Sequence, residues 1–224
     1  MQDGLSATRQ TLQVARDRNV PWVCLGDMKH LRDRWMLSAL NGLLALFKEY
    51  ADVPKLLLHG NHDGVAGGRS GLEVFREYAL VVEDPFVCKL PPTTSGWKEP
   101  FALWPHQPTL DGLPAFLEIA RKAKARVLFA HAFLSGAVLG PEEFRLAQKL
   151  ETFQYRRDVI TLEQFGLVGK NRVFDWGFLG DIHKQQHLDP NQSRGRWVIG
   201  VPTPGRPGGI RRTPKKDMSW SCPA

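Results

Sequence analysis

Residues with side chains that can bind metal ions occur at four positions along the chain. Their side chains carry carboxylate, amide and imidazole groups rather than thiols. Asp27 forms the first place, and residues 60–63, with the sequence Gly-Asn-His-Asp, form the second. His131 stands at the third, and Asp181 and His183 stand at the fourth. Oxygen and imidazole ligands suit Mn, Fe or Zn in an octahedral-leaning site better than a structural zinc. These residue types therefore indicate metal-assisted hydrolysis.

Each of these places follows a short apolar run that is typical of a buried strand. The runs cover residues 22–25, 55–58, 127–130 and 174–179. Residues that follow neighbouring strands meet at the carboxyl edge of a sheet, where sites normally gather. Taken singly, each place has an ordinary alternative, because Gly-Asp and Asn-His-Asp sequences are common in turns and a lone histidine is more often structural. The recurrence of the pattern at four strands favours a shared site.

Helices alternate with these strands along the chain. The spacing of apolar residues predicts helices over residues 6–18, 35–50, 113–124 and 141–150. Residues 80–89 and 100–104 form short strand-like runs broken by Pro and Gly, which suggests hairpins, and residues 196–201 are typical of a last strand. Alternating helices and strands predict an α/β sheet.

The composition limits the class of protein. A chain of 224 residues that is 42% hydrophobic can bury one good core, so we expect one domain over residues 1–202. Residues 203–224 are rich in Pro, Gly and basic side chains and are expected to be a disordered tail. Three widely spaced cysteines indicate neither a disulfide framework nor a thiolate site, and no apolar run approaches the ~20 residues that cross a bilayer. We therefore expect a cytoplasmic protein with no membrane contact.

The balance of charge bears on the partner. The formal net charge is +7, which favours a polyanion such as nucleic acid through counterion release. Part of the basic excess lies in residues 206–216, however, so the charge alone is a weak argument for nucleic acid.

In order and spacing, the four motifs resemble those of the calcineurin-like metallophosphoesterases over residues 5–202. His30, three residues after Asp27, and the sequence Asp-Ile-His-Lys at residues 181–184 resemble the SbcD-type branch of double-strand-break repair nucleases. The resemblance implies a four-layer α/β/β/α sandwich. It also implies a DNA exo- or endonuclease that hydrolyses phosphodiester bonds with two divalent metal ions, Mn first and Fe or Zn as alternatives. An SMC-like ATPase subunit is the protein partner that it suggests.

The same resemblance assigns roles to the metal-binding residues. Asp27 would bridge the two ions, and Asn61 and His131 would bind the second ion. His183 would bind the first ion. Asp181 occupies the place of the first histidine in the family's Gly-His-x-His motif, and a carboxylate there can still bind a hard divalent ion.

Two further histidines receive roles from the resemblance. His62 would act as the general acid or stabilise the transition state, and His30 would position the nucleic-acid substrate. The family's opening Asp-x-His motif is not found before Asp27, so the first strand and two ligands of the first ion are expected to be missing and activity to be impaired. Two alternatives therefore stay open. One is a phosphomonoesterase or cyclic-nucleotide phosphodiesterase of the same fold, and the other is a non-catalytic relative that binds nucleic acid.

Overall fold

The computed structural model describes residues 2–29, 34–64, 70–89, 99–135, 137, 159–182 and 198–200. Its strands are β1 (Trp22–Cys24), β2 (Lys55–Leu58), β3 (Leu80–Val82), β4 (Phe86–Cys88), β5 (Phe101–Trp104), β6 (Val127–His131), β7 (Phe133–Leu134), β8 (Val159–Ile160), β9 (Trp176–Gly180) and β10 (Val198–Gly200). Its helices are α1 (Gln2–Asp17), α2 (Leu37–Glu49) and α3 (Leu113–Lys122), with a 3₁₀ turn η1 (Glu73–Phe75).

Two sheets form the centre of the described part. A parallel three-stranded sheet has the order β1-β2-β3, and a five-stranded sheet has the order β10-β9-β6-β5-β4. In the second sheet only the pairing of β4 with β5 is antiparallel. The strands β7 and β8 form a separate parallel pair. This mixture of helices and mainly parallel strands confirms the α/β class.

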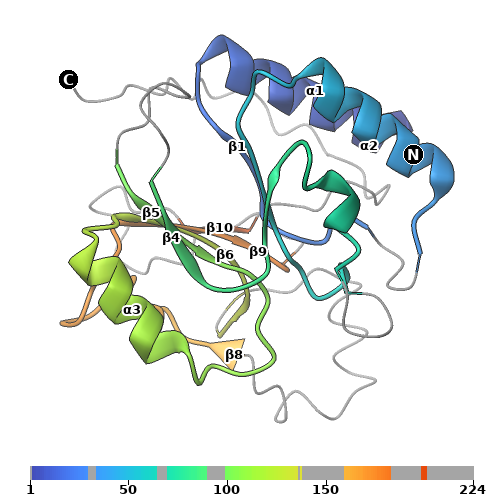
Figure 1. The fold of residues 1–224 in the computed structure, drawn as a ribbon. Helices are drawn as coiled ribbons and strands as arrows, with labels where there is room; N and C mark the ends of the chain where they lie inside the picture. Colours follow the sequence, from blue (N-terminus) through green and yellow to red (C-terminus); the bar gives the residue numbers. More distant parts are fainter. Residues whose placement is uncertain are drawn as a thin grey trace, which may run out of the picture.

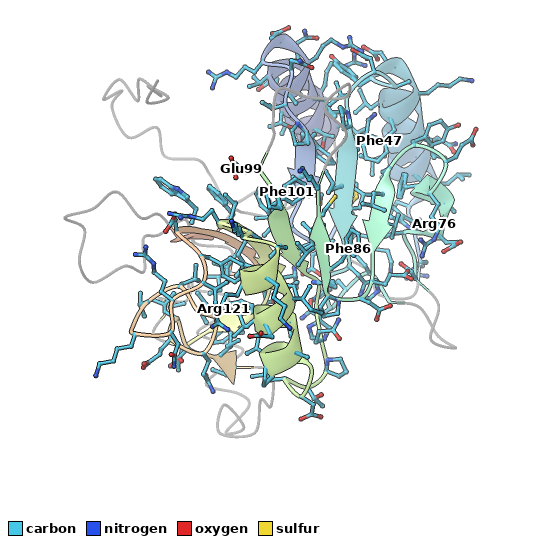
Figure 2. The ribbon with its side chains drawn as sticks, turned by 60° about the vertical axis from the view of Figure 1, so that its left-hand side comes forward. Phe47, Arg76, Phe86, Glu99, Phe101 and Arg121 are labelled. Carbon is cyan, nitrogen blue, oxygen red and sulfur yellow. The ribbon has the colours of Figure 1, made fainter. Side chains whose placement is uncertain are left out.

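Helices α1 and α2 pack on one face of the three-stranded sheet (Figure 1). Leu12 and Phe47 are fully buried there together with Leu57 of β2. The ring of Phe47 lies 5.7 Å from that of Trp22 and 5.2 Å from that of Phe75, measured between centroids. Buried aromatic pairs of this kind stabilise a core beyond the area that they bury. Figure 2 shows Phe47 in this half of the molecule and Arg121 on α3 in the other.

The opposite face of the three-stranded sheet contacts the five-stranded sheet. Because side chains alternate along a strand, Leu56 and Leu58 of β2 point away from Leu57 and pack with Phe101 and Leu103 of β5. All four positions are at most 1% exposed. Helix α3 covers the far side of the second sheet, where Phe116 packs in a cluster with the inner residues of β6 (Figure 1). Buried leucine and phenylalanine therefore join the two sheets.

The helices and strands differ from the sequence expectation in a few places. The helix expected over residues 6–18 begins earlier, at Gln2, and the strand-like run at residues 80–89 divides between the two sheets. The expected hairpins are correct for β4 with β5 but wrong for β3, which pairs in parallel with β2. The helix expected over residues 141–150 and the tail at 203–224 lie outside the described residues. None of the described helices is both long and apolar enough to cross a bilayer.

Candidate metal centre

The carboxyl ends of strands from both sheets carry the candidate ligands. Asp27 lies three residues beyond the end of β1, and residues 60–64 follow β2 after His59. His131 is the last residue of β6, and Asp181 directly follows β9. The register of β6 with β9 pairs His131 with Gly180, so the parallel pairing itself sets Asp181 beside His131.

Asp27, His131 and Asp181 form one cluster. Each offers a ligand atom, and these atoms all lie within 4.8 Å of one another. The Nε2 atom of His131 is 3.7 Å from Oδ1 of Asp27 and 3.8 Å from Oδ1 of Asp181. These distances are too long for hydrogen bonds. Two ligands of one ion, each bonded at about 2.0–2.2 Å, lie up to about 4.4 Å apart, so the spacing fits a shared ion.

The tautomer of His131 follows from its other ring nitrogen. Nδ1 lies 2.6 Å from the carbonyl oxygen of Leu25, and a carbonyl can only accept. In the neutral imidazole, Nδ1 therefore carries the proton, which leaves the lone pair on Nε2, facing the two carboxylates. The side chain is 1% exposed, and Nε2 has no hydrogen-bond partner among the residues that the structure describes. A buried, unpartnered imidazole lone pair beside two carboxylates is the donor arrangement that a divalent ion requires.

Glycines allow the strand ends to approach this closely. A Cβ on Gly26, whose φ is +97°, would lie 2.2 Å from Nδ1 of His131. A Cβ on Gly60 would lie 2.3 Å from the backbone nitrogen of Asp27. Any side chain at either position would separate the loops that carry the ligands.

The buried carboxylate of Asp63 joins the loops that follow β1 and β2. Its Oδ2 accepts hydrogen bonds from the backbone N–H groups of Asp27 (2.8 Å) and Gly60 (2.9 Å), and its Oδ1 accepts from that of Lys29 (3.4 Å). Burial raises the pKa of Asp63 to about 6, while the backbone hydrogen bonds oppose that shift. The residue fixes the position of Asp27 relative to the Gly-Asn-His-Asp loop.

Asn61 and His62 lie in that loop. The backbone N–H of His62 donates to Oδ1 of Asp27 at 2.9 Å, which places the loop against the cluster. The side-chain oxygen of Asn61 is buried and has no hydrogen-bond partner within the described ranges of the chain. An orphaned amide oxygen in a loop that contacts Asp27 fits a fourth metal ligand.

The structure therefore brings Asp27, His131 and Asp181 together and places Asn61 and His62 in the adjoining loop. His30 and His183, which we expected to position the substrate and to bind the first ion, lie outside the described residues.

Two residues near the centre, His106 and Lys29, have no role in the expectation from the sequence. The ring of His106 lies 6.2 Å from that of His131, and its backbone N–H donates to the carbonyl oxygen of His59 at 2.7 Å. Lys29 is buried, and its Nζ donates to the carbonyl oxygens of His62 (2.8 Å) and Gly64 (3.1 Å). His106 could have been found, because it follows the apolar strand β5 as the other site residues follow theirs. Nothing in the sequence distinguishes Lys29 from a solvated lysine.

The α/β fold carries at its strand ends a cluster of residues that could hold a divalent metal ion. The sequence profile of the family described as "Calcineurin-like phosphoesterase" matches residues 1–199, and the chain belongs to that family. Comparison with curated proteins gives no match. Family membership and the cluster of Asp27, His131 and Asp181 together indicate a hydrolase that acts on phosphate esters and binds divalent metal ions.

Proposed function

We propose that the chain is a DNA exo- or endonuclease of the SbcD type that uses Mn and hydrolyses phosphodiester bonds. The observation that carries the proposal is the buried Nε2 of His131, which has no hydrogen-bond partner in the described part of the chain and faces the carboxylates of Asp27 and Asp181. Membership of the phosphoesterase family supports hydrolysis, and the net charge of +7 favours a polyanionic substrate. His30 and the Asp-Ile-His-Lys sequence support the nuclease branch, through resemblance alone.

In this proposal each residue has a definite task. Asp27, Asn61, His131 and Asp181 hold a divalent ion, which supplies charge neutralisation at the phosphate and makes water more acidic. Leu25 fixes the tautomer of His131, and the N–H of His62 orients the carboxylate of Asp27. The His62 side chain protonates the leaving oxygen, as the resemblance implies.

The remaining assignments belong to the same proposal. His30 positions the DNA, and His183 binds the first of the two ions, whereas Asn61 and His131 bind the second. A four-layer α/β/β/α arrangement agrees with the separate clusters under α1 and α2, between the sheets and under α3. We also propose one domain over residues 1–202, a cytoplasmic location and an SMC-like ATPase as partner.

Calorimetric titration with Mn²⁺ tests the metal site. Wild type is expected to bind at least one ion, and Asp27→Ala is expected to bind none, because Asp27 contributes to the cluster. Asp17→Ala removes an exposed carboxylate at the end of α1, which leads into the opposite, amino end of β1, and is expected to bind like wild type. Two ions per chain would mean that residues beyond this cluster complete a second site. If wild type binds no ion, the metalloenzyme proposal fails and a non-catalytic binding role replaces it.

Hydrolysis of three substrates in Mn²⁺ then tests the substrate class. Linear duplex DNA, bis(p-nitrophenyl) phosphate and p-nitrophenyl phosphate represent a nucleic acid, a small diester and a small monoester. A nuclease is expected to cleave the DNA, to lose that activity in Asp27→Ala and to slow as salt is added. Preference for the monoester over DNA would instead identify a phosphomonoesterase.

A further inference from the structure

The candidate metal centre is rich in oxygen donors. Asp27 and Asp181 offer carboxylates, Asn61 offers a buried amide oxygen, and only His131 offers nitrogen. The side chains of Asp27, Asp181 and His131 are 9%, 12% and 1% exposed. Among these donors, Asp181 adds a second negative charge to the charge that Asp27 supplies.

The backbone holds Asp181 in a conformation that is costly for a residue with a side chain. Its φ is +83°, in the left-handed region, where a residue other than glycine loses about 1–2 kcal/mol. The preceding residue, Gly180, is fixed by its pairing with His131, and a Cβ on it would lie 2.3 Å from the carbonyl oxygen of Leu25. Strain that the surrounding structure imposes is typical of functional positions. The fold thus retains a carboxylate beside Nε2 of His131 in spite of its backbone cost.

Donor type affects which metal a site favours. Carboxylate, carbonyl and water oxygens suit hard ions such as Mn²⁺ and Mg²⁺, whereas imidazole suits Zn²⁺. Most sites still bind Zn²⁺ more tightly than Mn²⁺, so the relevant quantity is the ratio of the two affinities. We propose that Asp181 determines metal selectivity, because its carboxylate raises the affinity of this centre for Mn²⁺ relative to Zn²⁺. This inference rests on the proposed function, in that it requires the cluster to bind a divalent ion.

Dissociation constants for Mn²⁺ and Zn²⁺ test the inference without any measurement of activity. Calorimetry gives both constants, and the electron paramagnetic resonance signal of free Mn²⁺ gives an independent value for manganese. In Asp181→His the preference for Zn²⁺ over Mn²⁺ is expected to increase at least about tenfold relative to wild type. Asp17→His places the same new imidazole at the exposed end of α1, at the amino end of β1, and is expected to leave the ratio unchanged.

Asp181→Asn provides a second variant that is close in size and keeps an oxygen donor. We expect it to bind Mn²⁺ at least about tenfold more weakly and to lose less affinity for Zn²⁺, which still has the imidazole of His131. Circular dichroism melting would show that each variant is folded. If both metals bind wild type and neither Asp181 variant alters the ratio by more than about twofold, the selectivity role is overturned while the metal site stands. If wild type binds neither ion, both proposals fall.

Discussion

At the scale of single residues, the centre is distinguished by buried polar atoms that lack a hydrogen-bond partner among the described residues. The side-chain oxygen of Asn61 and Nε2 of His131 are buried without a partner in the described part of the chain. An unsatisfied buried polar atom costs about 1–3 kcal/mol. Two such atoms close to the same pair of loops indicate that the site is arranged for a ligand at the expense of stability.

Removing the amide of Asn61 should therefore weaken metal binding without lowering the free energy of unfolding. In the metal-free chain, we expect Asn61→Ala not to lower the free energy of unfolding and to raise it by up to about 1–3 kcal/mol, because the lost oxygen is buried without a hydrogen-bond partner among the described residues. Its affinity for Mn²⁺ should fall, because a ligand is missing. Urea denaturation with chelator and calorimetry with Mn²⁺ measure the two quantities. Clear destabilisation with unchanged Mn²⁺ affinity would make Asn61 a structural residue.

Cys24 gives a prediction that depends on pH. Burial raises the pKa of its thiol from 9.0 to about 12. Between pH 9 and 12 the thiol therefore keeps its proton in the folded chain and has lost it in the unfolded chain. At pH 8 the fraction present as reactive thiolate is about a thousandfold smaller in the folded chain than in the unfolded chain. Iodoacetamide labelling read by mass spectrometry should modify the Cys24 peptide far more slowly without urea than with it. Equal labelling rates in the two conditions would contradict this pKa.

At the scale of helices and strands, the sequence could identify the strands that carry ligands because each is an apolar run that leads within three residues to a polar residue able to bind metal. It could not identify β7 and β8, which are two residues long and leave no periodic pattern. It also could not divide residues 80–89 between two sheets, since β3 and β4 are both short apolar runs and their partners are set by tertiary packing. The local sequence pattern therefore predicted the ligands, but it did not predict which strands pair around them.

Lys29 connects the elements at the centre in a way that can be tested. Its Nζ donates to two carbonyl oxygens of the loop after β2, those of His62 and Gly64. Lys29→Met retains the apolar stem and leaves both carbonyls without this donor, which should cost about 1–3 kcal/mol of folding free energy. Because the loop contains Asn61, affinity for Mn²⁺ should also fall.

Lys122→Met is the matched control for this change. Lys122 lies at the end of α3 with a side chain that is 75% exposed, and its ion pair with Glu118 is a surface pair of little energetic value. The Lys122→Met variant is expected to unfold at the same urea concentration as wild type. If Lys29→Met also matches wild type in both stability and Mn²⁺ affinity, the hydrogen bonds of Lys29 do not hold the loop.

At the scale of the whole molecule, the candidate centre depends on how the two sheets pack together. Asp27 and Asn61 follow strands of the three-stranded sheet, whereas His131 and Asp181 follow strands of the five-stranded sheet. No single sheet holds the complete set. The hydrophobic cluster between the sheets, with Leu58 and Leu103 both at 0% exposure, therefore sets the separation of the ligands. Sequence patterns could not give this separation, because they do not show which apolar face meets which.

A cavity between the sheets should consequently weaken metal binding, and an equal cavity elsewhere should not. Leu103→Ala opens the cluster between the sheets, and Leu46→Ala opens the cluster under α1 and α2. Each is expected to cost about 2–5 kcal/mol of unfolding free energy in urea. Only Leu103→Ala should raise the dissociation constant for Mn²⁺ severalfold, because it alone loosens the contact between the sheets that carry the two halves of the centre. Equal Mn²⁺ affinities in the two folded variants would show instead that the hydrogen bonds of His131 with Leu25 and of His106 with His59, which cross between the sheets, suffice to hold the ligands.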